Sequence, residues 1–552
     1  MVLGMRYLIA QAYLSAVFMV MVGCSPSSVP ITSIEPQPIS TSTEARREVT
    51  AAVAPTTSSP TAPYGEIGGR LTVVVEADTA HLDVQQDISE TLAARGAGIA
   101  YSRLMRLKSD PGLDQPHLLI ECELCTEWEL LDPWTFRFKL RDDVRWQNAF
   151  PVRGRRLDAN DLLFSYTRQS TEGWPNAPLL KSVKGIRVES DGEFLVDLNY
   201  PDADFLLALA NGHSKIIPHE SINDETGRFQ GPVVGSGAWI WKSSSLGVGT
   251  MLERNKNYFE GELPFVEEIV FQIIDDSETQ VAALLADEID VLNISNDGWE
   301  ILQSYAATPR TIYSKQSGKG IFIAFNTGLE PFASIAMRRQ ILASLNPWDY
   351  IDDIWHGQSF VSPGIPVIES SWLMAREEIE ALLRDPVSGV PASFVITVAD
   401  FGDIYLDQAL RIQEDLRNTG FDPILDIVNP IDYAQQVWVD REFQMLVGPM
   451  PPNSGPNGFL FPILHSGGEW NLLGHGDDEL DLLIEKQHME LFDSQARAES
   501  IFKIQRHIVD QAYMLGLGDN VDRWVTNDEV RGFYPNPALS EYSFWSKVWI
   551  DG

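Results

Sequence analysis

The feature that most restricts the fold of this chain is a strand–helix–strand unit in its last third. Residues 394–398 form a short apolar run typical of a buried strand, and residues 424–428 form another. Between them, Asp403 can start a helix and Gly420 can end it. Such a unit predicts two parallel strands joined by a right-handed crossover, and therefore an α/β fold. The apolar face of the helix consists of Tyr405, Ala409, Ile412 and Leu416.

Other segments show the same alternation of strand and helix patterns. In residues 134–140 three apolar residues alternate with polar ones, which predicts a half-buried strand. Asp158 is placed to cap the helix that follows, and Ser277 with Gln280 has the spacing of a capping box ahead of another helix. We also expect strands at 71–75 and 269–274 and helices at 478–492 and 494–513.

The chain is long and acidic. Its 552 residues exceed what one hydrophobic core usually organises, so we expect two or three domains. Its 41 basic and 78 acidic residues give a net charge of −37, which repels nucleic acid and anionic lipid surfaces. Neither is therefore an expected partner. The acidity favours either a cationic ligand or simply solubility after export, and composition does not separate the two.

The N-terminus has the pattern of an export signal. Arg6 precedes an apolar run at 7–22 that is short for a membrane span and suits the core of a signal peptide. The run ends at Gly23-Cys24, which resembles a lipoprotein signal in which Cys24 carries the lipid after cleavage. An uncleaved anchor helix is the alternative. The Ser-, Thr- and Pro-rich residues 24–66 are expected to form a flexible tether.

The two remaining cysteines form a CxxC pair, Cys122 and Cys125. In an oxidising compartment a structural disulfide is favoured over free thiols. Three neighbouring glutamates disfavour a thiolate, and hence a redox-active pair. Zinc would need two further ligands, and the sequence has no second CxxC and no HxxxH.

Four segments in order resemble the extracellular solute-binding proteins of family 5, which include oligopeptide-, dipeptide- and nickel-binding proteins of ABC importers. The first, 126–165, resembles the family's pattern from "SWE" to "LTAEDVVFS". The second, 235–259, resembles "GTGPY" followed by "LERNPDYW". The third, 280–291, resembles the family's helix followed by "GEVDV". The fourth contains Phe325-Asn326-Thr327, Pro331-Phe332 and Arg338.

The resemblance implies a periplasmic-binding-protein-like α/β fold with two lobes around a ligand cleft and an extra inserted domain. The implied order, after the signal peptide at 1–23 and the tether at 24–66, is lobe I at 67–104, the inserted domain at 105–232, lobe I again at 233–320, lobe II at 321–515, and lobe I at 516–552. The lobes are expected to close on the ligand.

The resemblance also implies the function. We expect a lipid-anchored monomer, exported and facing the periplasm or cell exterior, that delivers a small solute to the permease of an ABC importer. A binding protein that serves a sensor is one alternative, and an exported enzyme is another. No catalytic set and no cofactor are expected. A metal site is conceivable only where His465 and His475 lie near Asp477 and Asp478.

The ligand is where the sequence departs from the family. Peptide binders carry a loop like "GWxADYxDP", whose aspartate pairs with the peptide amine, but the matching residues 448–459 contain no carboxylate. An unpaired ammonium in a closed cleft is costly, so we expect weak binding of simple free-amine peptides. A neutral solute such as an oligosaccharide, or an amine-blocked peptide, is favoured. Peptides remain the alternative if a carboxylate from Asp78, Asp83 or Asp87 reaches the same point. The candidate ligand contacts are Trp174, Trp239, Asn326, Trp438, Asn453, Asn457 and Trp470.

Overall fold

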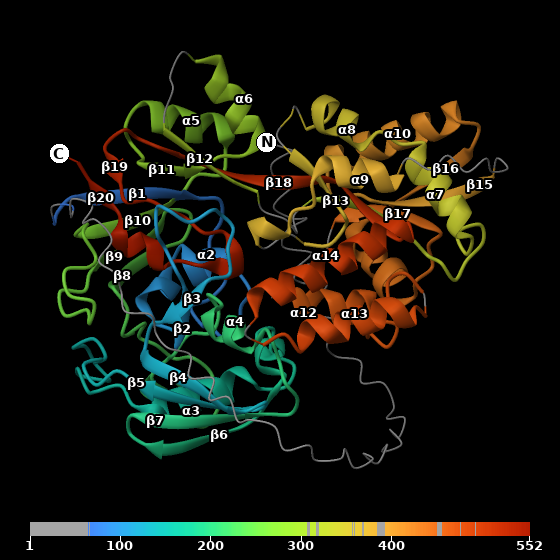
Figure 1. The fold of residues 1–552 in the computed structure, drawn as a ribbon. Coiled ribbons are helices and arrows are strands. Elements are labelled where there is room, and N and C mark those ends of the chain that lie inside the picture. Colours follow the sequence, from blue (N-terminus) through green and yellow to red (C-terminus); the bar gives the residue numbers. More distant parts are fainter. Residues whose placement is uncertain are drawn as a thin grey trace, which may run out of the picture.

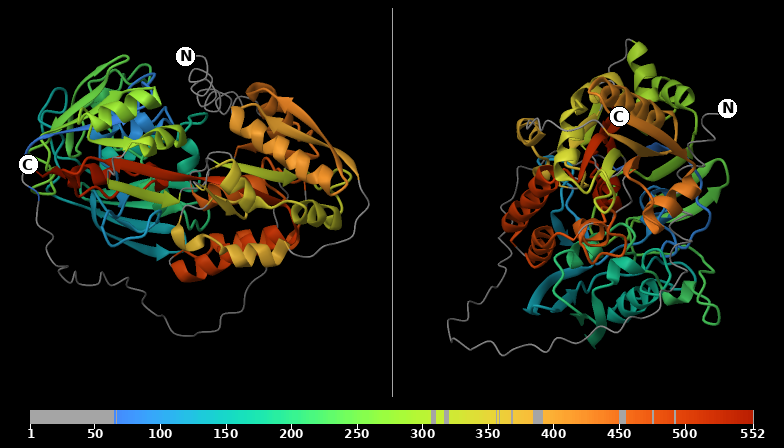
Figure 2. Two further views of the ribbon diagram at one scale, coloured as in Figure 1. Left: turned by 90° about the horizontal axis from the view of Figure 1, so that it is seen from above. Right: turned by 90° about the vertical axis from the view of Figure 1, so that its right-hand side faces the viewer.

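The computed structural model describes residue 65 and residues 67–305, 310–315, 320–355, 357, 359–366, 369–383, 392–449, 455–474, 476–491 and 493–551. The predictions for the signal peptide, Cys24, the tether, Asn453 and His475 lie outside these residues. Figures 1 and 2 show two lobes side by side, with a smaller sheet beneath one of them.

One mixed sheet of 12 strands runs through both lobes. Its main path, from one edge to the other, is β16 (Asp422–Val428), β15 (Ser393–Ala399), β17 (Met445–Pro449), β13 (Ile321–Phe325), β18 (Met514–Thr526), β11 (Val291–Asn293), β1 (Arg70–Val75), β10 (Glu268–Ile273), β9 (Gly249–Arg254) and β8 (Trp239–Ser245). Off this path, β12 (Arg310–Lys315) and β14 (Ser359–Ser362) both pair with β18.

Strand β18 joins the lobes. Its first residues pair with β13 and β14 in lobe II, and its last residues pair with β11 and β12 in lobe I. The chain crosses a second time between β12 and β13, which run antiparallel to β18. Two neighbouring strand crossings therefore connect the lobes, and β18 is the red arrow that spans both of them in Figure 1.

A separate four-stranded antiparallel sheet lies within the predicted inserted domain. Its order is β4 (Cys125–Asp132), β5 (Thr135–Leu140), β7 (Glu193–Leu198) and β6 (Val183–Ser190). Two short pairs complete the sheets: β2 (Met105–Leu107) with β3 (Ile120–Cys122), and β19 (Val530–Arg531) with β20 (Trp549–Ile550). A disulfide joins Cys122 to Cys125 and closes the turn between β3 and β4.

Helices cover the sheets in each part of the chain. In lobe I and the inserted domain they are α2 (Glu90–Ala94), α3 (Ala159–Gln169), α4 (Phe205–Ala210), α5 (Ser277–Leu285) and α6 (Asn296–Ser304). In lobe II they are α7 (Ile335–Ala343), α8 (Pro347–Asp353), α9 (Arg376–Leu383), α10 (Asp403–Asn418), α11 (Pro430–Tyr433), α12 (Pro456–Phe459), α13 (Asp478–His488) and α14 (Ser494–Asp510).

The locally predicted elements are present, but the helices expected at 478–492 and 494–513 end earlier, at His488 and Asp510. Strands β15 and β16 are parallel and joined through α10, and Asp158 caps α3 in a capping box with Asp161. The predicted cap at Ser277 is wrong by one position. Asp276 is the N-cap of α5, because its carboxylate accepts from the Thr279 N–H, and Ser277 is the first helical residue.

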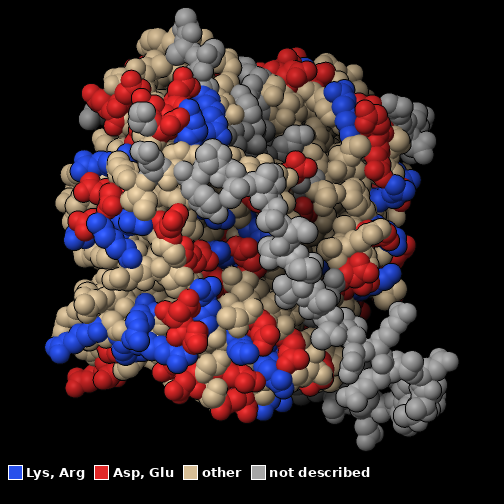
Figure 3. Space-filling model, turned by 60° about the vertical axis from the view of Figure 1, so that its left-hand side comes forward, with Lys and Arg blue, Asp and Glu red and all other residues tan. Residues whose placement is uncertain are grey.

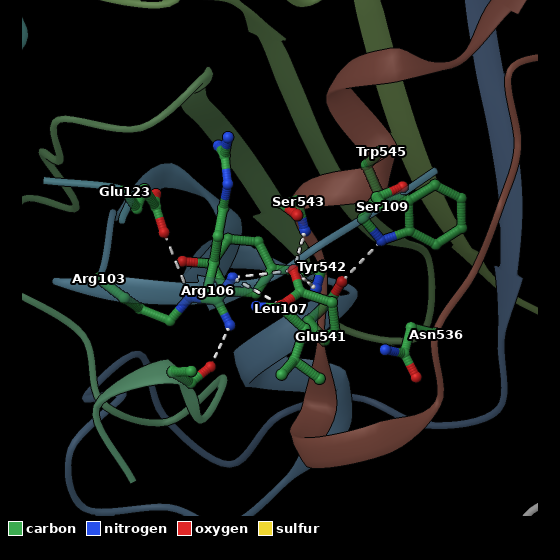
Figure 4. Close-up of polar contacts among 12 residues, drawn as sticks. Arg103, Arg106, Leu107, Ser109, Glu123, Asn536, Glu541, Tyr542, Ser543 and Trp545 are labelled. Atoms are coloured by element: carbon green, nitrogen blue, oxygen red, sulfur yellow. Dashed lines mark hydrogen bonds and ion pairs between the residues drawn. The ribbon is translucent and has the colours of Figure 1, made fainter. Parts of the chain in front are cut away.

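A buried ionic cluster ties the C-terminal segment to the start of the inserted domain (Figure 4). Arg103 and Glu541 point toward one another, and the guanidinium donates to the Glu541 carboxylate at 2.8 and 3.1 Å. Arg103 also donates to the Ala210 carbonyl and lies over the Tyr542 ring. Burial alone would raise the pKa of Glu541, but Arg103 and the Ser543 N–H hold the pKa of this carboxyl at about 2. The pair is therefore charged and fully desolvated.

Candidate functional site

The register of the strands shows which edges of the two halves of the sheet face one another. In lobe I, β1, β10 and β11 are parallel, and the carboxyl end of β11 lies beside Trp524, toward the crossing segment of β18. In lobe II, β15, β16 and β17 are parallel, and β17 ends at Pro449, opposite Ile321 at the other crossing. The carboxyl ends of both sets therefore point toward the strand crossings. Ligands of open α/β sheets bind outside such ends.

We call this region the facing edge. It consists of the loops that follow β1 and β15, the carboxyl end of β17, and the crossing strands. Asp78 lies in the first of these loops, and its carboxylate accepts the Gly247 N–H at 2.5 Å. Asp522 lies where β18 enters lobe I, and its carboxylate accepts from the Asn293 amide at 2.9 Å and the Trp524 indole at 3.0 Å. The groups that donate to these two carboxylates are neutral.

The other two aspartates that sequence analysis proposed are engaged differently. Asp83 is buried and forms an ion pair with Arg168 at 2.6 Å, so its charge is neutralised. Trp174, a predicted ligand contact, packs its ring 4.5 Å from the same guanidinium. Asp87 accepts the Ser89 N–H at 2.7 Å and lies further along the chain from β1. Of the three, Asp78 is the one best placed at the facing edge.

The other predicted tryptophans lie within or against hydrophobic cores. Trp239 begins β8 with 2% of its surface exposed, so it packs in the core of lobe I. Trp438 is also buried, and Trp470 contacts it edge to face at 5.9 Å between ring centroids. Their role in ligand binding stays a prediction, and the positions favour packing.

The predicted asparagines hold loops together. Asn326 is buried, donates to the Arg441 carbonyl at 2.9 Å and accepts the Gly328 N–H at 3.0 Å. Asn457, in the loop that resembles the family's ligand-reading loop, donates its backbone N–H to Asp204 at 2.7 Å. The carboxylate of Asp204 thus reaches this loop from the inserted domain. Sequence analysis missed this residue, because 253 positions separate the two partners.

No group of three His, Cys, Asp or Glu side chains that could hold a metal occurs among the described residues. Two of the predicted metal candidates, Asp477 and His465, make other contacts. Asp477 caps α13 and accepts from the His507 ring at 2.7 Å and the Tyr513 hydroxyl at 2.8 Å. The His465 ring lies 3.4 Å from Glu485. These contacts stabilise the helical layer of lobe II.

Acidic and basic side chains both occur over the face shown in Figure 3, and basic side chains gather along its lower left. Within the part of the chain that the structure describes, none of the helices has the length and apolarity needed to span a membrane.

Comparison with known families shows the class of protein. The model of the bacterial extracellular solute-binding proteins, family 5, matches residues 120–471. This chain belongs to that family. The expected fold is confirmed as well: the structure of HbpA2 from Haemophilus parasuis superposes with a TM-score of 0.74 at 19% identity, over 87% of this chain and 100% of that one.

Two relatives are similar over most of their length. A probable di/tripeptide-binding protein 5 of Pseudomonas aeruginosa is 23% identical, over 85% of this chain and 93% of its own. A heme-binding protein A of Haemophilus influenzae is 22% identical, over 78% of this chain and 84% of its own.

Proposed function

We propose that this protein is the non-catalytic solute-binding component of an ABC importer, which captures a peptide-like solute between its lobes and passes it to the permease. The observation that supports this most directly is the facing edge, where parallel strands of both lobes end at the two strand crossings. A solute held there contacts both lobes, so binding stabilises their closed arrangement. A sensor as the recipient is the second candidate, and coexpression with a permease distinguishes the two.

We further propose that Cys24 carries a lipid that anchors the protein to the membrane. Cys24→Ser should abolish lipid attachment and release the exported protein into the soluble fraction, because one cysteine thiol is the acceptor. Mass spectrometry and membrane fractionation measure both effects. Ser25→Ala is the matched control and should remain membrane-bound. A Cys24→Ser protein that still fractionates with membranes would contradict the anchor.

The solute is where the structure revises our sequence-based expectation. A neutral ligand was favoured because the loop at 448–459 has no carboxylate. The facing edge nevertheless carries the carboxylates of Asp78 and Asp522, supplied from lobe I. We therefore propose a peptide-like solute with a free amine. The relative of P. aeruginosa, whose name gives di- and tripeptides, supports this choice, and the heme-binding relative gives no support to a sugar.

Calorimetric titration with di- to pentapeptides tests this proposal. Free-amine peptides should bind at micromolar concentration or tighter, and N-acetylation should weaken binding at least about tenfold, which is ~1.4 kcal/mol of lost charge pairing. Asp522→Asn should cause a similar loss. Asp426→Asn, on the exposed edge strand β16, is the matched control and should bind normally. Binding of cello- or xylo-oligosaccharides, or equal affinity for acetylated peptides, would overturn the proposal.

A further inference from the structure

The lobes also meet at a place away from the strand crossings. Residues 200–204, which precede α4 in the inserted domain, contact the start of α12, the end of α13 and the start of α14 in lobe II. We call this the α4–α12 contact; both helices lie near the centre of Figure 1. The α4–α12 contact is separate from the strand crossings. A rotation of the lobes about the crossings therefore either preserves the α4–α12 contact or breaks it.

An ion pair forms the centre of the contact. Asp204 and Arg497 bond through their charged groups and are both mostly buried. Arg497 donates to the Ala203 carbonyl as well, while Asp204 accepts the Asn457 N–H at 2.7 Å. Breaking a desolvated pair of this kind leaves two uncompensated charges unless water enters. The contact is therefore either fully formed or open.

A directed chain of hydrogen bonds extends from this ion pair. A guanidinium can only donate hydrogen bonds. Arg497 donates to the side-chain oxygen of Gln487 at 3.2 Å, so this oxygen must face Arg497. The Gln487 amide group must then donate to the Asn457 oxygen, at 2.6 Å. The Asn457 amide group in turn donates to Asp202 at 3.2 Å and to Nδ1 of His488 at 2.7 Å. Nδ1 must accept this bond, so His488 is neutral in the formed contact.

The surroundings of His488 favour this neutral state. Its ring lies 5.6 Å from the Tyr200 ring and 5.1 Å from the Phe461 ring, between centroids. Burial lowers the pKa of His488, Asp202 and Asp204 act in the opposite direction, and Arg497 lowers it further. Asp202 lies 3.8 Å from Nδ1, and the His465 ring stacks on the same Phe461 ring at 5.5 Å between centroids.

Protonation of His488 reverses the polarity at the end of the chain. A proton on Nδ1 turns an acceptor into a donor that faces the donating amide of Asn457. The amide cannot turn without losing its bond from Gln487, and Gln487 cannot turn without facing Arg497 with donors. Each hydrogen bond in this series therefore opposes protonation of His488. The proton can be accommodated only if the α4–α12 contact opens.

We propose that the α4–α12 contact is an acid-sensitive latch, in which neutral His488 keeps residues 200–204 docked on lobe II and protonated His488 releases them. The latch is intact above about pH 6.5, which is the pKa of a free imidazole, and it weakens as the pH falls below that value. One proton changes the ratio of open to latched molecules by at most about tenfold per pH unit. The proposal rests on the proposed function only in that lobe movement is what captures the solute.

One other titratable group links the same two parts of the molecule. Glu369 of lobe II accepts the Leu118 N–H of the inserted domain at 2.7 Å, and burial raises the pKa of Glu369. A carboxyl whose pKa is raised by burial binds its proton more tightly in the docked state, so acidification acts through Glu369 to hold the lobes together, opposite to the effect proposed for His488. An experiment must therefore separate Glu369 from His488.

Distance measurement between spin labels on the two parts tests the latch without any solute. Labels introduced through an unnatural ketone side chain at the exposed positions Lys181 and Glu414 leave the disulfide untouched. The full-length mature protein should give a narrow distance distribution at pH 7.5 and a broader one, with longer distances, at pH 5. Arg497→Met should already be broad at pH 7.5.

His488→Asn is the decisive variant, because asparagine keeps an acceptor near the position of Nδ1 and does not titrate. It should stay narrow at both pH values. His465→Asn and Glu369→Gln are the matched controls and should respond to pH as the unmodified protein does. A pH response that persists in His488→Asn, disappears in Glu369→Gln, or is absent from the unmodified protein overturns the latch. Since no peptide is used, failure of the proposed solute would leave this result unaffected.

Discussion

Arg103→Met should lower the free energy of unfolding by about 3–5 kcal/mol at pH 7, because it leaves Glu541 buried and without its counter-charge. Both side chains are fully desolvated in the structure, and Met retains most of the volume of the Arg stem. Urea-induced unfolding of the mature protein, followed by tryptophan fluorescence, measures the change.

The pH dependence of the stability difference between Arg103→Met and the unmodified protein shows whether the lost ion pair causes it. In the unmodified protein the pKa of Glu541 is held at about 2, so its contribution to stability is present above about pH 4.5 and is lost as the pH falls toward 2. Without Arg103, burial dominates and raises this pKa, so the variant approaches the unmodified protein in stability as the pH falls from 7 to 4. A stability difference that stays constant over this range would assign the loss to packing instead.

An exposed ion pair provides the control for this prediction. Arg137 and Glu129 lie 2.6 Å apart, but 42% and 56% of their side-chain surfaces are exposed. Solvent screens such pairs, so Arg137→Met should cost less than about 1 kcal/mol. Equal losses for the two arginine variants would contradict the importance of burial.

Gly235→Ala should be the second strongly destabilising change. A Cβ at Gly235 would lie 1.8 Å from the Ala100 carbonyl oxygen and 2.5 Å from its carbon, and backbone atoms cannot rotate away. The Gly235 backbone also bonds to Gln147, which lies within another family-like segment. Overpacking of this kind costs up to about 3 kcal/mol or more.

Gly185→Ala in β6 is the matched control, because no atom lies within 4 Å of its added Cβ. We expect its unfolding midpoint in urea to change little, by less than about 0.5 kcal/mol in free energy. If Gly235→Ala unfolds at the same urea concentration as the unmodified protein, Gly235 is not needed for close approach.

Local patterns predicted the elements that depend on near neighbours. The alternation at 134–140 became β5, with Phe136 and Phe138 buried in the inserted domain. The order of four family-like segments predicted the two-lobed fold before any coordinates were considered. The misplaced cap of α5 shows the limit of this approach, since Asp276 and Ser277 are both good capping residues and only the backbone path chooses between them.

The candidate site was harder to predict, because side-chain position depends on distant chain segments. Trp239 was selected as an aromatic in a loop, but β8 begins at this residue and buries it. Asp522 was not selected, since nothing in its sequence neighbourhood indicates that β18 enters lobe I at that point.

By itself, the sequence determined the α/β class, the family, the acidic charge and the positions of most strands and helices, because these follow from periodicity, composition and ordered motifs. Only the tertiary structure decided which charges are neutralised and which remain. Asp83 is neutralised by Arg168, 85 positions away, and Asp204 by Arg497, 293 positions away. Ion pairing depends on distance in space and on desolvation, and neither is encoded in the spacing of residues along the chain.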